Sequence, residues 1–375
     1  MMGCKGKKEI LIFYSNFGDG HLQAARAIEE AIHLQQAHYN TMVIDFMECL
    51  HPVIYPVSRH IYMQGVKNFP SIYRYIFHKT RKSNFSRILK TLHISSIKRM
   101  IKLLKDMDPS VVVCTFPLAA ATMSMLKSYG LTEVPTVTVI TDHTDHGIWT
   151  YSHIDQYIVG SDPVRQSLKK YGVPDGNIAV TGIPIRPAFN QPYSRDHLKS
   201  KYSLDPTLPT ILVAGGGYGL LGEGLSSLLT SDALPQKLQF IFVCGHNEKL
   251  KKQLTETLQH SKHHILITGY VDYIHELMGV SDLMITKAGG LTIAEALAME
   301  LPMLFYKPLP GHEQDNAQIF IQAGVAMQAD HLMDLKAMME KILHNPHLLQ
   351  EMKEKTKQFH RKQSAFDALD IIMQA

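Results

Sequence analysis

The chain has 375 residues, long enough for two domains with separate hydrophobic cores. Apolar residues make up 45% and charged residues 19% of it, which is ordinary for a globular protein. The four cysteines form no Cys-x-x-Cys pair, so buried thiols are predicted. The N-terminal apolar run is too short for a signal peptide, so no secretion signal is predicted. The longest apolar stretch is interrupted by Pro117, so no bilayer span is predicted.

The net charge of +4 conceals an uneven distribution. The basic tract, residues 49–105, holds twelve Lys or Arg residues and no Asp or Glu, so the rest of the chain carries all 34 acidic residues with 26 of the 38 basic ones. Aromatic residues interleave with this tract: Tyr55, Tyr62, Phe69, Tyr73, Tyr75, Phe77 and Phe85. Cations mixed with aromatic rings suit an anionic membrane surface, whereas a solvated basic face and a nucleic-acid site are the alternatives. We expect this tract to contact a membrane through residues that include Lys79, Arg81, Lys82 and Arg87, and we expect no binding of nucleic acid.

The first half of the chain alternates apolar runs of strand length with helical patterns. Strands are predicted at residues 9–14, 41–46, 110–114, 134–140, 155–159 and 177–181. Helices are predicted near residues 21–36, 83–106, 117–128 and 161–171. This alternation indicates a parallel sheet with helices on both faces.

A segment with five prolines, residues 184–209, separates this half from a second alternating region. Strands are predicted there at TILVA, LQFIFV, HILIT, LMIT and PMLFY, and the tail from about residue 330 is predicted to be helical. The sequence therefore predicts an α/β protein of two Rossmann-like domains, residues 1–190 and 191–375, that face each other across a cleft. The C-terminal helices are assigned to the second domain, although packing on the first stays open.

The first predicted strand is followed by NFGDGH, a Gly-x-Gly turn that ends in a histidine. A dinucleotide fingerprint needs a small residue where Gln23 stands, so a nicotinamide site is disfavoured even though Asp45 ends the next strand. His21 lies at a predicted helix start, where the dipole disfavours the imidazolium, and a neutral imidazole can act as a general base. A histidine that only stabilises the turn is the alternative.

The clearest glycine signal is AGGGYGLLGEG, residues 214–224, directly after the strand TILVA. The backbone N–H groups of Gly215, Gly216 and Gly217 would approach a pyrophosphate closely, and the next helix N-terminus would favour its charge. Another post-strand turn at the same sheet edge contains Gly245. These glycines predict a nucleotide-binding edge, with a flexible loop as the alternative.

The segment ITKAGGLTIAEA, residues 285–296, repeats this arrangement. Gly289 and Gly290 precede a predicted helix, and Glu295 is expected in its first turn, where a carboxylate would accept hydrogen bonds from both ribose hydroxyls. The spacing Thr292-x-x-Glu295 is also that of a capping box, which would give the glutamate a structural role. The spacing alone leaves both interpretations open.

The segment KPLPGHEQDNAQ, residues 307–318, follows the next predicted strand. It places Glu313, Gln314, Asp315 and Asn316 at the start of a helix. Such side chains suit recognition of several sugar hydroxyls. A polar helix start without a ligand is the alternative.

The segment TDHTDHGIW, residues 141–149, gathers acidic and histidine side chains after a strand of the first half. Two histidines three residues apart beside carboxylates would suit a metal, but no third ligand cluster is evident. We expect a polar wall and no metal here. The residues concerned are Asp142, His143, Asp145 and His146.

Seven segments in order carry a resemblance that spans nearly the whole chain: NFGDGHLQAARAI, TFP, TDHTDHGIW, TGIPIRP, GYVDYIHEL, ITKAGGLTIAEA and PGHEQDNA. In this order they resemble the monogalactosyldiacylglycerol synthase and processive diacylglycerol glucosyltransferase family. The resemblance implies an inverting GT-B glycosyltransferase that needs no metal or other cofactor. It implies that His21 is the candidate base, that Glu295 binds the ribose, and that Glu313 and Gln314 bind the donor sugar. Asp142 is the next catalytic candidate if His21 is not the base.

The implied reaction moves glucose from UDP-glucose to diacylglycerol or glycosyl-diacylglycerol at the cytoplasmic face of the cell membrane, with a peripherally attached enzyme. Bacterial members of the family usually have PGQEK where this chain has PGHEQ, so His312 and Gln314 leave the choice between glucose and galactose open. A transferase or epimerase with a soluble substrate is one alternative. A non-catalytic sensor of UDP-sugars at a membrane surface is another, from a different functional class.

Overall fold

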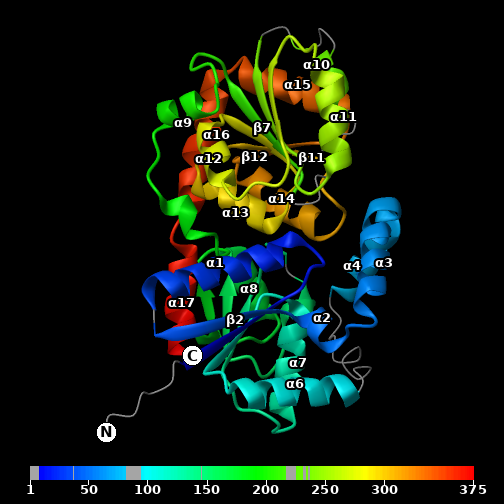
Figure 1. The fold of residues 1–375 in the computed structure, drawn as a ribbon, viewed down its shortest axis with the longest axis vertical. Helices are drawn as coiled ribbons and strands as arrows, with labels where there is room; N and C mark the ends of the chain where they lie inside the picture. Colours follow the sequence, from blue (N-terminus) through cyan, green and yellow to red (C-terminus); the bar gives the residue numbers. More distant parts are fainter. Residues whose placement is uncertain are drawn as a thin grey trace. The chain divides into compact units, whose positions relative to one another are not determined.

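The computed structural model describes residues 8–36, 38–81, 94–144, 146–216, 225–230, 234 and 237–375. It divides into a first unit, Met1–Pro187 with Lys362–Ala375, and a second unit, Ala188–Arg361 (Figure 1). The expected boundary at residue 190 lies close to this division. The last helix, expected in the second domain, lies in the first unit.

The first unit contains a parallel sheet of six strands in the order β2-β1-β3-β4-β5-β6 (Figure 1). The strands are β1 (Lys8–Tyr14), β2 (Tyr39–Asp45), β3 (Val111–Cys114), β4 (Thr136–Val139), β5 (Gln156–Val159) and β6 (Ile178–Val180). The helices are α1 (Asp19–Gln35), α2 (Phe46–Leu50), α3 (Tyr55–Asn68), α4 (Pro70–Thr80), α6 (Ile94–Met107), α7 (Pro117–Ser128), α8 (Asp162–Lys170) and α17 (Ser364–Gln374), with a 3₁₀ turn η1 (Gly147–Trp149). All six strands predicted for this half are confirmed.

Strand β1 shows how the sequence builds the two faces of this sheet. Ile10 and Ile12 pack in a core formed with α1 and α17, whereas Leu11 and Phe13 pack in a core formed with α2, α6, α7 and α8. Successive side chains of a strand point to opposite faces, so a strand covered on both sides is apolar throughout. Each of these side chains is fully buried, and the burial of each contributes about 1.5–3 kcal/mol to the stability of the folded state.

The second unit contains another parallel six-stranded sheet, in the order β12-β11-β10-β7-β8-β9 (Figure 1). The strands are β7 (Thr210–Ala214), β8 (Gln239–Val243), β9 (His264–Thr268), β10 (Leu283–Thr286), β11 (Met303–Tyr306) and β12 (Ala326–Ala329). The helices are α9 (Arg195–Lys201), α10 (Leu225–Thr230), α11 (Glu248–Leu258), α12 (Ile274–Val280), α13 (Gly290–Ala298), α14 (His312–Gln322), α15 (Leu332–Leu343) and α16 (Pro346–Thr356). Five of these strands were predicted. The sequence pattern missed β12, which is four residues long and contains no β-branched residue.

The strand order of each sheet locates the place where ligands bind in such folds. Chain order reverses between β1 and β3 in the first sheet and between β7 and β10 in the second. Ligands of open parallel sheets bind outside the carboxyl ends of the strands at such a reversal. In the first sheet the turn before α1 lies at this point, and in the second sheet the glycine turns after β7 and β10 do.

Candidate active site

His21 lies at the reversal point of the first sheet. It is the third residue of α1, so the prediction of a histidine at a helix start is confirmed. Its Nδ1 lies 3.0 Å from Oγ1 of Thr141, and its carbonyl oxygen accepts a hydrogen bond of 2.9 Å from Oγ1 of Thr115. These threonines come just after β4 and β3. The ends of three neighbouring strands thus fix His21, Thr115 through its backbone and Thr141 through its half-buried imidazole.

The hydrogen bond to Thr141 bears on which ring nitrogen can take up a proton. A threonine hydroxyl accepts when Nδ1 carries the proton, and in that tautomer Nε2 is the basic nitrogen. The dipole of α1 disfavours a positive charge on the ring at this helix position. The arrangement therefore suits a neutral histidine that acts as a base through Nε2.

Aromatic side chains pack around this histidine. The ring of Phe116 meets His21 edge-on at a centroid distance of 5.5 Å, and the ring of Trp149 lies 6.1 Å away. Phe17 stacks on Phe116 at 5.9 Å. Phe116 and Trp149 belong to the TFP and GIW motifs, but the sequence pattern did not predict that they contact His21, because the contacts join residues about 100 positions apart.

The segment TDHTDHGIW supplies packing and hydrogen bonds of the first unit. His143 is buried, with Nδ1 3.0 Å from Oγ of Ser161, and burial lowers its pKa to about 4 although Asp142 nearby opposes the shift. His146 accepts a hydrogen bond from the backbone of Ile148 at the start of η1. Asp142 is half-buried beside Thr141, and Asp145 lies outside the described residues. Within the described ranges no group of three or more His, Cys, Asp or Glu side chains could hold a metal.

In the second unit, the predicted glycine turns follow strands that are neighbours in the sheet: β8, β7 and β10. Oγ1 of Thr286 donates a hydrogen bond of 2.8 Å to the carbonyl of Ala214, which ties the ends of β10 and β7 together. Gly216 and Gly245 have φ angles of 72° and 58°, in the left-handed region that favours glycine. Gly215 directly follows β7, whereas Gly217 lies outside the described residues.

The structure corrects the expected position of Glu295. Helix α13 begins at Gly290, with Gly289 as its N-cap residue, so Glu295 lies in the second turn and not in the first. Thr292 is therefore inside the helix, and the capping-box interpretation is wrong. The N-cap forms no side-chain hydrogen bond. A half-buried carboxylate on this helix, after the two glycines, remains a ribose-binding candidate.

Helix α14 begins at His312 and brings the other predicted donor-site residues to the same edge. Glu313 is 8% exposed and its carboxylate accepts a hydrogen bond of 2.6 Å from the backbone N–H of Leu309. Asn316 is fully buried, and its amide donates to the carbonyl of Ala288 at 3.0 Å. These two side chains therefore hold the backbone of the turns before α14 and α13. Gln314 is half-buried in the first turn of α14.

Two further features of this edge were not predicted from the sequence. Burial lowers the pKa of Lys287, which directly follows β10, while Glu313 nearby opposes the shift. The ring of His246, after β8, stacks on that of Tyr270, after β9, at 4.5 Å and an interplanar angle of 9°. A lysine inside the motif ITKAGG was visible in the sequence, but no local pattern indicates its burial.

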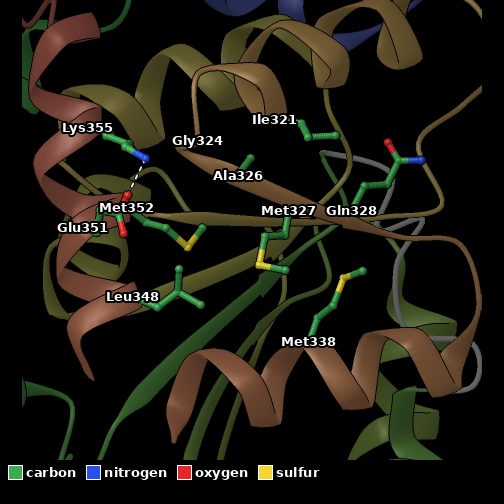
Figure 2. A pocket seen from close by; sticks show the side chains of 10 residues that line it. All are labelled: Ile321, Gly324, Ala326, Met327, Gln328, Met338, Leu348, Glu351, Met352 and Lys355. Atoms are coloured by element: carbon green, nitrogen blue, oxygen red, sulfur yellow. Dashed lines mark hydrogen bonds and ion pairs between the residues drawn. The ribbon is translucent and has the colours of Figure 1, made fainter. Parts of the chain in front are cut away.

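A separate hollow of the second unit contains none of the predicted site residues (Figure 2). Three methionines line it, Met327, Met338 and Met352, and an ion pair of 2.6 Å between Lys355 and Glu351 lies beside it. Its lining residues come from α14, β12, α15 and α16 and from the turn at Gly324.

The basic tract forms α3, α4 and α6 in the described part of the chain. Lys79 lies on α4 with its ammonium 5.6 Å from the ring centroid of Tyr75, and Arg81 follows the end of α4. Lys82 and Arg87 lie outside the described residues. Among the side chains of this region that the structure describes, the exposed large apolar ones are Val53, Ile54, Val57, Ile61, Phe69, Ile72, Tyr75 and Ile76. No described helix has the length and apolar character needed to cross a bilayer.

Comparison with known proteins matches both halves of the chain to one kind of enzyme. The profile of the Monogalactosyldiacylglycerol (MGDG) synthase family matches residues 21–185, and that of the Glycosyltransferase family 28 C-terminal domain matches residues 210–368. A processive diacylglycerol beta-glucosyltransferase of Bacillus cereus is 32% identical over 97% of this chain and 93% of its own length. The chain belongs to the processive diacylglycerol β-glucosyltransferase family. The Bacillus pumilus member of this family is 30% identical over 98% of this chain and 95% of its own length.

Solved structures establish the fold of this family member as GT-B. MurG of Acinetobacter baumannii matches with a TM-score of 0.65 and 15% identity, over 98% of this chain and all of its own. UDP-GlcNAc 2-epimerase of Neisseria meningitidis, solved with UDP-GlcNAc bound, matches with a TM-score of 0.62 and 13% identity, over 98% of this chain and all of its own. The predicted class, a two-domain α/β protein of GT-B architecture, is confirmed.

Proposed function

We propose that this protein transfers a glucosyl group from UDP-glucose to diacylglycerol, with inversion at the anomeric carbon. The observation that carries the proposal is the similarity to the Bacillus diacylglycerol glucosyltransferases along 97% of the chain. The placement of His21 at the reversal point of the first sheet adds a suitable base. Processive addition of a second glucose to the product is part of the same proposal.

In this reaction the acceptor hydroxyl loses its proton to Nε2 of His21 as its oxygen forms a bond to C1 of glucose. The bond from C1 to the β-phosphate oxygen breaks at the same time, and UDP leaves with the electron pair. Thr141 would accept a hydrogen bond from the Nδ1–H group of the ring, which keeps the proton on Nδ1 and leaves Nε2 as the basic nitrogen during the approach of the acceptor. General-base assistance of this kind typically contributes about 10²–10⁴-fold in rate.

The second unit would bind the donor and stabilise the leaving diphosphate. Backbone N–H groups in the turns at Gly215, Gly216 and Gly289 supply donors beside the N-terminus of α13, where an anion is favoured. Glu295 would bind the ribose hydroxyls. The stacked rings of His246 and Tyr270 offer a flat apolar surface for the nucleobase at the same edge.

The acceptor side would attach peripherally to an anionic membrane. Large apolar side chains on α3 and α4 are strongly exposed, such as Ile61 at 65% and Ile76 at 53%, next to the cations of the basic tract. Apolar side chains that enter the interface and cations that meet anionic headgroups are the two elements of such binding. We propose the cytoplasmic face of the cell membrane as its site.

The test is a transfer assay with the purified full chain. Labelled UDP-glucose is incubated with vesicles that contain diacylglycerol, and UDP release is measured beside label in the extracted lipid. The proposal predicts equal amounts of UDP and of glucosyl diacylglycerol with a β-linkage. UDP release with the label in water or in a soluble product would reject it, and a parallel assay with UDP-galactose checks the choice of sugar.

A further inference from the structure

Asp45 forms a buried hydrogen-bond centre that joins the His21 turn to the basic tract. Asp45 is the last residue of β2 and is 5% exposed. It accepts hydrogen bonds from Ser15 Oγ at 3.2 Å and from the backbone of Asn16 at 3.2 Å, both in the turn before α1. It also accepts from two backbone N–H groups of α2 and, at 2.7 Å, from the hydroxyl of Tyr55. These five hydrogen bonds give Asp45 a structural role.

Tyr55 is the first residue of α3, so this centre fastens that helix to the turn that carries His21. Arg59, one helical turn later, donates from Nε to the carbonyl of Asn16 at 3.1 Å. The ring of Phe17 contacts Tyr55 at 6.0 Å on one side and stacks on Phe116 on the other, and Phe116 in turn contacts His21. A continuous series of contacts thus leads from α3 to the imidazole.

A second connection leads from α4 to the other loop beside His21. The ring of His146 lies 4.6 Å from that of Phe77, and its Nε2 lies 3.1 Å from the carbonyl oxygen of Phe77. Its Nδ1 accepts from the N–H of Ile148, so the neutral ring carries its proton on Nε2 and donates to Phe77. The backbone of Gly147 also donates to the carbonyl of Arg81 at 2.9 Å. This loop continues directly to Trp149, whose ring lies 6.1 Å from that of His21.

Each of these two connections begins at a buried side chain of α3 or α4, which together are called the α3–α4 pair. Among the described side chains of α3 and α4, Tyr55 and Phe77 are the buried ones, at 8% and 9% exposure, and the others are half-buried or exposed. Figure 1 shows α3 and α4 side by side in the first unit. A segment with so few buried contacts is weakly attached, so its position responds to whatever binds its exposed surface.

We propose that Tyr55 and His146 are positioning residues of the transfer reaction. They tie the two ends of the α3–α4 pair to the two loops beside His21, so that seating of this pair on a lipid surface aligns the imidazole with the acceptor hydroxyl. The inference rests on the proposed function, since it concerns regulation of the same base. It assigns these roles to the phenol of Tyr55, which donates to Asp45, and to the imidazole of His146, which contacts the carbonyl of Phe77.

The test uses two substitutions that each weaken one connection by removing a side-chain hydrogen bond, to Asp45 in one case and to the carbonyl of Phe77 in the other. Tyr55→Phe removes the hydroxyl that reaches Asp45 but keeps the ring beside Phe17. His146→Asn keeps an oxygen that can accept from Ile148 N–H but is too short to reach Phe77. The matched controls are Tyr129→Phe and His153→Asn, which alter exposed side chains of the same unit.

Rates are measured with diacylglycerol in vesicles of phosphatidylglycerol and phosphatidylcholine, and with a short-chain diacylglycerol dispersed without vesicles. Each variant should lower kcat on vesicles about fivefold, the equivalent of one net hydrogen bond of about 1 kcal/mol, while the control variants keep the parent rate. KM for UDP-glucose and sedimentation with vesicles should stay at parent values. The rate on the dispersed acceptor should change by less than twofold, because no surface positions the helical pair there.

A purely structural role gives a different result. It would lower the melting temperature and reduce the rates on vesicles and on the dispersed acceptor by the same factor, or it would leave the two rates at the parent value. Either outcome overturns the inference. The melting temperature is read from the fluorescence of Trp149, the sole tryptophan of the chain. If one variant fails to fold, the other decides the question alone. A parent protein that transfers no sugar to either acceptor would instead reject the proposed function.

Discussion

Acidification should destabilise the first unit through one buried histidine, His143. Its side chain is 5% exposed, and burial lowers its pKa from 6.5 to about 4 although Asp142 nearby opposes the shift. Below the ordinary pKa of histidine, the imidazole of His143 therefore binds a proton in the unfolded chain but not in the folded protein. This contribution to stability is fully present near neutral pH and is lost as the pH falls from about 6.5 towards 4.

The expected size follows from the two pKa values. One pKa unit corresponds to 1.36 kcal/mol, so between about pH 7.5 and pH 5 the free energy of unfolding should fall by about 2 kcal/mol on account of this residue. Urea unfolding followed by the fluorescence of Trp149 reports on the first unit alone, because this buried residue is the sole tryptophan. The probe therefore stays valid even if the two units unfold separately.

The comparison that isolates His143 is the difference between the parent and His143→Asn at each pH. The parent should lose about 2 kcal/mol more than the variant over this range, and the exposed-site control His153→Asn should follow the parent. Parallel pH dependence of the parent and His143→Asn would refute the reasoning, because the buried ring would then titrate at its ordinary pKa.

Four further variants test the active site and the membrane surface. His21→Ala should lower kcat by about 10²–10⁴-fold with unchanged UDP affinity, and an acid limb in the parent's pH profile should vanish in the variant; turnover within threefold of the parent would exclude the base role. Thr141→Val should lower kcat about fivefold without a change in melting temperature, measured by initial rates and a melting curve. Glu295→Gln should weaken UDP binding by about 1.5–3 kcal/mol in a calorimetric titration, and unchanged affinity would argue against ribose binding. Replacing both Lys79 and Arg81 with Gln should weaken sedimentation with anionic vesicles by about 1 kcal/mol per charge, an effect that salt should reduce.

The strands and the turns after them could be predicted from the sequence because their signals are local. Apolar runs bounded by glycine and proline gave eleven of the twelve strands, and β12 was missed because AMQA has no strand-like pattern. Since parallel strands end at one edge, the glycine turns at Gly216, Gly245 and Gly289 could be assigned to that edge as well. The strand order that makes them neighbours came only from the structure.

The contacts that give each side chain its role could not be predicted, because they join distant segments. Asp45 was visible in the sequence only as the end of a predicted strand, yet its partners include Ser15, thirty positions earlier in the chain. The capping-box spacing at Glu295 was misleading because two glycines before it start the helix earlier. His146 suggested a metal ligand by type, whereas its ring nitrogens contact Ile148 and Phe77. Local spacing cannot distinguish these roles.

Transfer of a hexosyl group from a nucleotide sugar to a membrane lipid can be measured directly. The purified chain is incubated with UDP-[¹⁴C]glucose and vesicles with or without diacylglycerol, and the extracted lipids are then separated. Labelled β-glucosyl diacylglycerol should form only when diacylglycerol is present, with one UDP released per glucose transferred. Hydrolysis of UDP-glucose, or label in a soluble product, with no labelled lipid would contradict this expectation.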